Sequence, residues 1–127
     1  MSPPDFRLSR IGQIFMPVGD LARAVAFYRE VLGMTFLFEV PRMAFFDLDG
    51  VRLMLGEREE GAAHPGSILY YPVDDLPEAH ATLVGRDVSF ELEPTLIAEM
   101  EDHDLWMAFF QDTEGNQLAL MSEVAKG

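Results

Sequence analysis

His103 is the side chain best suited to acid–base chemistry in this 127-residue sequence. It lies within Glu101-Asp-His-Asp104, whose carboxylates would favour the protonated imidazole. If that segment is a loop above a cleft, the imidazole could act as a general acid or base. The alternative is a solvated turn histidine with acidic neighbours. His103 is therefore the one catalytic candidate, and both interpretations stay open.

The other histidines lie in unlike contexts. His64, in Ala-Ala-His-Pro-Gly, is interpreted as a linker residue, and His80 lies within a helical pattern. A metal site built on imidazoles would require His64 and His103 to converge in the fold. The acidic residues of the second half lack calcium-loop spacing, so we expect a solvated face from Glu91, Glu93, Glu99 and Glu101.

Several chemistries are excluded by what the sequence lacks. There is no cysteine, which removes disulfides, thiolate metal sites and cysteine nucleophiles. Neither a glycine-rich phosphate loop nor a Gly-x-Ser-x-Gly elbow occurs. The formal net charge is −13 and the only lysine is Lys126, so nucleic acid and anionic membranes are poor partners. No signal peptide or bilayer-length apolar run is present, which predicts a cytoplasmic protein.

The first half of the chain predicts one strand, one helix and three further strands. Asp20 is a candidate helix N-cap, and Gly33 stands where a left-handed residue would end the helix. Asp49-Gly50 is typical of a tight hairpin turn. The strands are expected at Ile11–Pro17, Thr35–Val40, Met43–Leu48 and Val51–Leu55.

The second half repeats this pattern, because Val73-Asp-Asp-Leu copies Val18-Gly-Asp-Leu. Strands are expected at Ile68–Pro72, Val88–Leu92, Leu105–Gln111 and Gln117–Met121, and Glu93–Asp104 is expected to be a long irregular loop. The prediction is a single α+β domain over residues 1–127 with two βαβββ modules, at about 10–57 and 67–122, joined by a linker at 58–66.

Two motifs resemble the vicinal-oxygen-chelate superfamily, which includes glyoxalases, bleomycin-resistance proteins and extradiol dioxygenases. Val18-Gly-Asp-Leu-Ala-Arg-Ala-Val-Ala-Phe-Tyr, with Leu32-Gly33, resembles the family's opening pattern. Phe109-Phe-Gln-Asp-Thr-Glu-Gly-Asn resembles its closing pattern, with Thr113 in place of the usual proline. The resemblance covers residues 10–122 and implies paired modules whose sheets curl around a cleft, commonly in a homodimer.

The resemblance also implies where a metal would bind. Family enzymes hold a divalent ion with four inward-facing residues, one on the first and one on the last strand of each module. The internal repeat places those positions at Gln13, Met54, Ile68 and Ala119. Only the Gln13 amide suits a hard or borderline cation, since a Met54 thioether prefers soft Cu(I). We therefore expect no metal and no other cofactor.

Alternation along strands adds candidate pocket residues to these four. Phe15, Tyr70 and Arg52 share the inward face of their neighbours. Arg52 would need a carboxylate, from either an internal salt bridge or an anionic ligand. The single tryptophan, Trp106, is either a core or dimer-interface residue or a ligand-stacking wall.

Three functions remain open from the sequence. The first is a metal-independent protein that binds a small molecule, such as an antibiotic, another xenobiotic or a metabolite. The second is a lyase, isomerase or dioxygenase of the same fold that uses a non-standard metal site or His103. The third is an interaction module whose cleft is filled by its own side chains.

Overall fold

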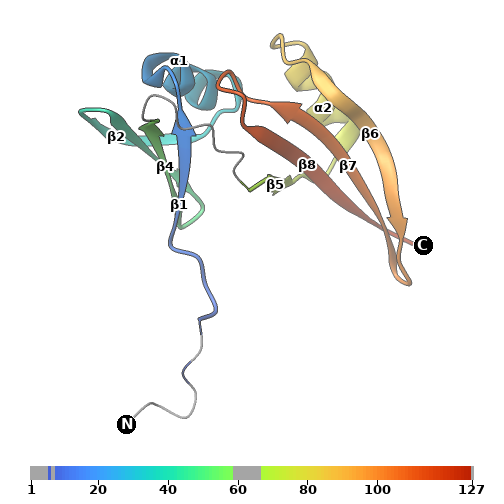
Figure 1. The fold of residues 1–127 in the computed structure, drawn as a ribbon. Coiled ribbons are helices and arrows are strands. Elements are labelled where there is room, and N and C mark those ends of the chain that lie inside the picture. The colour runs from blue at the N-terminus through green and yellow to red at the C-terminus, as the bar shows by residue number, and fades with distance from the viewer. Residues whose placement is uncertain (1–5, 7, 59–66, 127) are drawn as a thin grey trace.

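The computed structural model describes residue 6, residues 8–58 and residues 67–126. These residues form two four-stranded sheets, and we call each sheet with its helix a module (Figure 1). The first module contains β1 (Gln13–Val18), α1 (Leu21–Ala26), the π-helical turn η1 (Phe27–Val31), β2 (Thr35–Val40), β3 (Met43–Leu48) and β4 (Val51–Glu57). The second contains β5 (Leu69–Pro72), α2 (Leu76–Val84), β6 (Phe90–Glu99), β7 (His103–Gln111) and β8 (Gln117–Ala125).

Both sheets have the same topology, which confirms the predicted α+β fold with two βαβββ modules. The strand orders are β1-β4-β3-β2 and β5-β8-β7-β6, with the first and last strands of each module paired in parallel. The register also repeats, because Phe15 lies opposite Met54 just as Tyr70 lies opposite Ala119. The repeat in the sequence is therefore a repeat in strand register.

The local signals for helix starts and turns are confirmed. The carboxylate of Asp20 accepts the Arg23 backbone N–H at 3.0 Å, and Asp75 begins α2 in the same way. Gly33 ends the first helical segment with a φ of 73°. Asp49 and Gly50 have φ values of 52° and 96°, as a two-residue hairpin turn requires.

The predicted irregular loop at Glu93–Asp104 is wrong. Most of this segment belongs to strands, because β6 continues to Glu99 and β7 begins at His103. Pro94 is tolerated because β6 is the edge strand of its sheet and its pairing with β7 shifts register between Leu92 and Thr95. Proline and alternating charges in this stretch hid an edge strand that departs from regular pairing.

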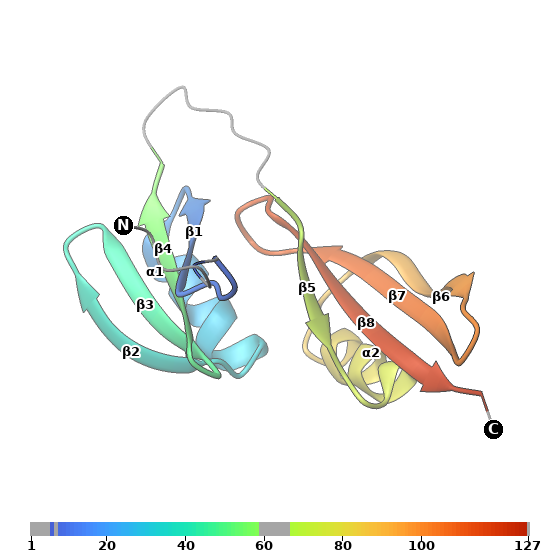
Figure 2. The same cartoon turned by 90° about the horizontal axis from the view of Figure 1, so that it is seen from below.

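Both helices cover the same side of the sheet layer, and the two sheets lie side by side (Figure 2). Alternate strand residues such as Met16 and Leu53 point to the helices and are buried. The opposite side of each sheet has no helix of the described residues over it, and we call it the open face. Its central residues are Gln13, Phe15, Phe45, Arg52, Met54, Tyr70, Phe109, Gln117, Ala119 and Met121.

No strand pairing within the described part of the chain joins the two sheets, so they do not close around a cleft. A shared core under the helices holds the modules together instead. Tyr28 and Phe46 of the first module belong to the same buried cluster as Leu83 and Phe110 of the second. Neither helix of the described residues has the length and apolar character that crossing a membrane demands.

Candidate functional site

Gln13 and Met54 meet on the open face of the first module. They lie on the neighbouring strands β1 and β4, and the Gln13 Nε2 atom is 3.9 Å from the Met54 Sδ atom. Phe15, which is 53% exposed, is the next residue of β1 on the open face. A Cβ atom added to Gly56 would lie 2.6 Å from the Phe15 ring, so the glycine leaves room for it. The site therefore consists of one amide, one thioether and an aromatic wall.

The corresponding positions of the second module are entirely apolar. Ile68 comes just before β5, and Ala119, the third residue of β8, is fully buried. Tyr70 and Phe109 lie opposite Ala119 on its two neighbouring strands, and their rings meet edge to face at 6.1 Å. This half of the open face therefore presents an aromatic pair over a small residue.

The residues at the four family positions do not fit a divalent metal. Ile68 and Ala119 have no lone pair to offer, and the thioether of Met54 is a poor ligand for hard or borderline ions. The described part of the chain has no group of three His, Asp or Glu side chains placed to hold an ion. His64 lies outside the described residues. One amide and one thioether are therefore too few and too ill-matched to coordinate such an ion.

Arg52 lies on the open face, as the alternation of side chains along β4 predicts. Its guanidinium carbon lies 5.8 Å from the centre of the Phe45 ring on β3. None of the ion pairs between described residues includes Arg52. Of the two alternatives for Arg52, the internal salt bridge is therefore not found among these residues, and the guanidinium lies over the Phe45 ring instead.

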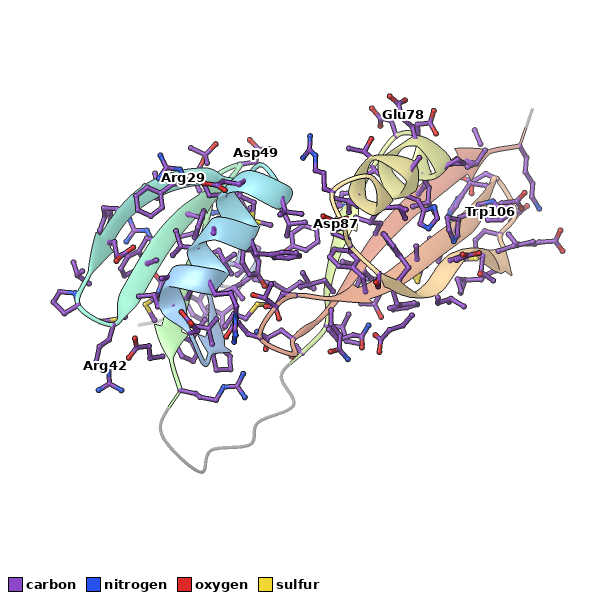
Figure 3. The ribbon with its side chains drawn as sticks, turned by 90° about the horizontal axis from the view of Figure 1, so that it is seen from above. Arg29, Arg42, Asp49, Glu78, Asp87 and Trp106 are labelled. Carbon is purple, nitrogen blue, oxygen red and sulfur yellow. The ribbon has the colours of Figure 1, made fainter. Side chains whose placement is uncertain are left out.

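Trp106 lies on the side of its sheet that faces the helix, away from the other predicted pocket residues. It pairs in register with Ser122, which is 3% exposed, whereas its neighbours in β7 alternate onto the open face. The indole lines a separate cavity of about 400 Å³ with Asp74, Pro77 and Pro94. Figure 3 shows Trp106 at the end of the second module remote from the first.

His103 is the first residue of β7 and shares the open-face parity of Phe109, but it lies at the other end of the strand. Its Nδ1 atom is 2.7 Å from Asp102 and its Nε2 atom 3.2 Å from Glu123. The hydrogen bond from His103 lowers the pKa of Asp102. The histidine is thus held between carboxylates, outside the group formed by Gln13, Met54 and Phe15.

His80 has a packing role in the structure. Its ring lies edge-on to Phe90 at 4.5 Å, between α2 and β6. This contact agrees with the interpretation of His80 as a residue of a helical pattern.

The sequence interpretation missed a polar cluster that connects the modules. Glu114, in the turn between β7 and β8, accepts the backbone N–H groups of Gly19 and Asp20 at 2.9 and 2.7 Å. Arg23 donates two further hydrogen bonds to this carboxylate, and the Glu114 side chain is fully buried. Burial would raise the pKa of Glu114, but the hydrogen bonds from Arg23, Thr113 and the two N–H groups outweigh it and lower the pKa to about 2.

Asp112 holds the same turn in place through hydrogen bonds to both of its carboxylate oxygens. One of its oxygens accepts the Tyr28 hydroxyl at 2.6 Å, and the other accepts the backbone N–H groups of Glu114 and Asn116. The Asn116 side chain continues to the carbonyl of Pro17 at 2.9 Å. The closing motif recognised in the sequence is therefore a structural bridge from the second module to β1 and the first helical segment.

The one signal in the sequence for this bridge is that the opening and closing motifs, far apart along the chain, both contain polar residues in turns. Their spacing does not show that the two turns meet. The contact depends on the arrangement of the modules, which strand periodicity does not determine.

The comparisons with known proteins agree with this architecture. A family model described as Glyoxalase/Bleomycin resistance protein/Dioxygenase superfamily matches residues 10–120. A lactoylglutathione lyase from Agrobacterium tumefaciens is 19% identical with a TM-score of 0.75, covering 91% of this chain and 95% of its own.

Two further solved structures share the fold. A superfamily member from Sphaerobacter thermophilus is 24% identical with a TM-score of 0.75, covering 91% of this chain and 98% of its own. A virulence protein from Salmonella typhimurium is 16% identical with a TM-score of 0.76, covering 94% and 100%. At these identities the structures show the fold alone. Because the family model spans most of the sequence, the chain belongs to the glyoxalase/bleomycin resistance protein/dioxygenase superfamily.

Proposed function

We propose that this chain is a small-molecule-binding protein that works as a homodimer without a divalent metal. The observation that carries the proposal is the contact between Gln13 and Met54. At two of the positions where family enzymes place metal ligands, this chain has the Gln13 amide in contact with the Met54 thioether. The other two positions hold the hydrocarbon side chains of Ile68 and Ala119. Such groups suit contact with an organic molecule better than coordination of an ion.

The open faces have the composition of a ligand site. Aromatic and aliphatic side chains predominate, while Gln13, Asp47, Arg52 and Gln117 supply a few polar groups. The Arg52 guanidinium, stacked on Phe45, offers donors to an anionic or carbonyl-bearing group. We propose a hydrophobic or aromatic ligand with one such group, in the class of antibiotics, other xenobiotics or metabolites.

A second copy of the chain would complete the cleft. The two open faces of one chain point the same way, so neither can form the wall opposite the other (Figure 2). Phe15, Ile68 and Tyr70 are 53%, 38% and 43% exposed on these faces. Exposed apolar side chains of this kind are typical of an interface, and a two-fold axis would set the first module of one copy against the second module of its partner.

The test is a screen of hydrophobic compounds and antibiotics against protein with isotope-labelled methyl groups, followed by NMR. We expect hits to shift the signals of Met54, Ala119 and Met121, and Phe15→Ala to weaken binding by about tenfold. The matched control Val84→Ala removes an exposed apolar side chain from α2 and should leave binding unchanged. Hits that bind equally well to Phe15→Ala, or that leave the open-face methyls unshifted, would refute the proposal.

A second candidate function rests on the pair formed by His103 and Glu123. A carboxylate beside an imidazole orients it and favours proton transfer, so this end of the open face could perform acid–base chemistry on a bound molecule. If a substrate is found, His103→Gln should abolish turnover while the melting temperature stays within a few degrees. Retained turnover in this variant would exclude the histidine mechanism.

A further inference from the structure

The cavity of about 400 Å³ beside Trp106 lies on the helix side of the second module. The start of α2 and the strands β6, β7 and β8 supply its apolar walls, through Pro77, Pro94, Trp106 and Val124. Its volume lies within the range of small-molecule sites.

This cavity is separate from the open face. Trp106 and Ser122 point to the opposite side of the sheet from Phe109 and Ala119, their respective open-face counterparts on β7 and β8. A molecule in the cavity would therefore contact neither Gln13 nor Met54. Binding there is independent of the function proposed for the open face.

Trp106 offers the cavity an aromatic ring that no cation of the described residues occupies. The two cation–π contacts between described residues use the rings of Phe36 and Phe45. Lys126, the only lysine, lies 3.5 Å from Asp104 in an ion pair. Because an indole attracts cations more strongly than the other aromatic rings do, Trp106 is suited to a cation from outside the chain.

The charged side chains among the described residues that line the cavity are the carboxylates of Asp74 and Asp75. Asp75 accepts the backbone N–H of Glu78 at 3.0 Å, whereas Asp74 is exposed and forms no ion pair with a described residue. The start of a helix carries about half a positive charge, which two carboxylates outweigh. The electrostatic field at the cavity therefore favours a positive ligand.

Ser122 adds a polar group to the cavity lining. The residue is 3% exposed, yet no described residue hydrogen-bonds to its hydroxyl, and the oxygen is not fully enclosed by protein atoms. A hydroxyl in this position can accept a hydrogen bond from a molecule in the cavity.

We propose that this cavity is a second binding site, which takes an organic ammonium ion with a small apolar body. Asp74 supplies the opposite charge and the Trp106 ring faces the cation. Ser122 Oγ accepts a hydrogen bond from the ammonium group. The apolar body lies against Pro77, Pro94 and Val124, which line the same cavity.

The test uses three probes of similar size: benzylammonium, benzyl alcohol and benzoate, which are positive, neutral and negative. Trp106 is the only tryptophan, so the intrinsic fluorescence of the full-length protein reports on this cavity. Methyl NMR follows Leu76 and Val124 for the cavity, and Met54 and Ala119 for the open face. We expect benzylammonium to bind about tenfold more tightly than benzyl alcohol, and benzoate to bind most weakly.

A pair of charge variants makes the test specific. Asp74→Asn should weaken benzylammonium binding about fivefold and leave benzyl alcohol binding unchanged. Glu39→Gln removes the same charge from an exposed residue of β2 in the other module and should change neither.

Two further variants test the other groups. Ser122→Ala should weaken the binding of benzylammonium and of benzyl alcohol by similar factors, because each donates a hydrogen bond to Oγ. Trp106→Leu, followed by methyl NMR, should reduce the preference for benzylammonium over benzyl alcohol. Thermal melts of each variant verify folding.

Three results would overturn the proposal. The first is no change in Trp106 fluorescence or in the Val124 methyl signals at millimolar benzylammonium. The second is binding of benzyl alcohol or benzoate as tight as that of benzylammonium. The third is an equal effect of Asp74→Asn and Glu39→Gln. Because the open-face methyls are followed separately, failure of the cavity site leaves the proposed function untouched.

Discussion

Glu114 and Arg23 form a two-point ion pair across the junction of the modules, with Nε–Oε2 at 2.7 Å and Nη2–Oε1 at 3.1 Å. The arginine is half exposed, but the carboxylate is fully buried. Two backbone N–H groups at the start of α1 bind the same carboxylate. One glutamate in a turn of the second module thereby fixes where the first module's helix begins.

Glu114→Gln should lower the free energy of unfolding by about 2–3 kcal/mol, because it removes the charge that these donors surround. Urea denaturation at neutral pH measures the change. Glu57→Gln is the matched control, since Glu57 pairs with Arg42 at 3.1 Å on the surface. It should cost less than about 0.5 kcal/mol. Equal costs for both variants would show that the buried carboxylate has no special role.

The stability contributed by Glu114 should depend on pH. Its pKa of about 2 lies below the usual value of 4.5, so the stabilisation is complete above about pH 4.5 and is lost as the pH falls through 2. The difference in unfolding free energy between wild type and Glu114→Gln should therefore shrink across this window. Urea midpoints for both proteins between about pH 6 and 2.5 measure it. A constant difference would contradict the lowered pKa.

Tyr28→Phe should destabilise the protein by about 1–2 kcal/mol, because it takes one donor from the buried Asp112 carboxylate. Burial, followed by the charge and hydrogen bond of Asp112, raises the pKa of Tyr28, so this phenol should not ionise while the chain is folded. Urea denaturation and ultraviolet absorbance during alkaline titration test the two statements. Tyr70→Phe removes a hydroxyl from the open face and should leave the free energy of unfolding unchanged.

Phe15→Lys should weaken the proposed dimer, because it places a charge in the middle of an apolar open face. Sedimentation equilibrium should show a dissociation constant raised by about a hundredfold or more. Val84→Lys changes an apolar side chain of similar exposure on α2 and should leave the dimer intact. A monomeric wild type, or a dimer unaffected by Phe15→Lys, would contradict a dimer built on this face.

Local signals in the sequence predicted most of the fold. Asp20, Gly33 and Asp49-Gly50 each determine a cap or turn by their own chemistry. The family resemblance and the internal repeat located Gln13 and Met54, and strand periodicity then placed Arg52 on the same face. Such features depend on residues close together in the chain. They could therefore be interpreted without knowing the tertiary structure.

The features that were missed depend on contacts between distant segments. Periodicity could not show that Trp106 faces the helix rather than the open face, because the register of β7 was not known. Pro94 and its charged neighbours concealed the edge strand β6. The partners of Glu114 lie in the other module, which no local pattern indicates.

Metal content distinguishes a metal-independent binding protein from a metal-dependent enzyme of the same fold. Untagged protein is incubated in turn with Ni, Co, Zn, Mn and Fe(II), desalted and measured by elemental analysis, alongside Gln13→Ala. Because the open face offers only an amide, a thioether and hydrocarbon side chains, we expect far less than one retained ion per chain. Wild type and Gln13→Ala should not differ. Retention of one ion per chain that is lost in Gln13→Ala would contradict the proposed metal-independent function and indicate a metal-dependent enzyme.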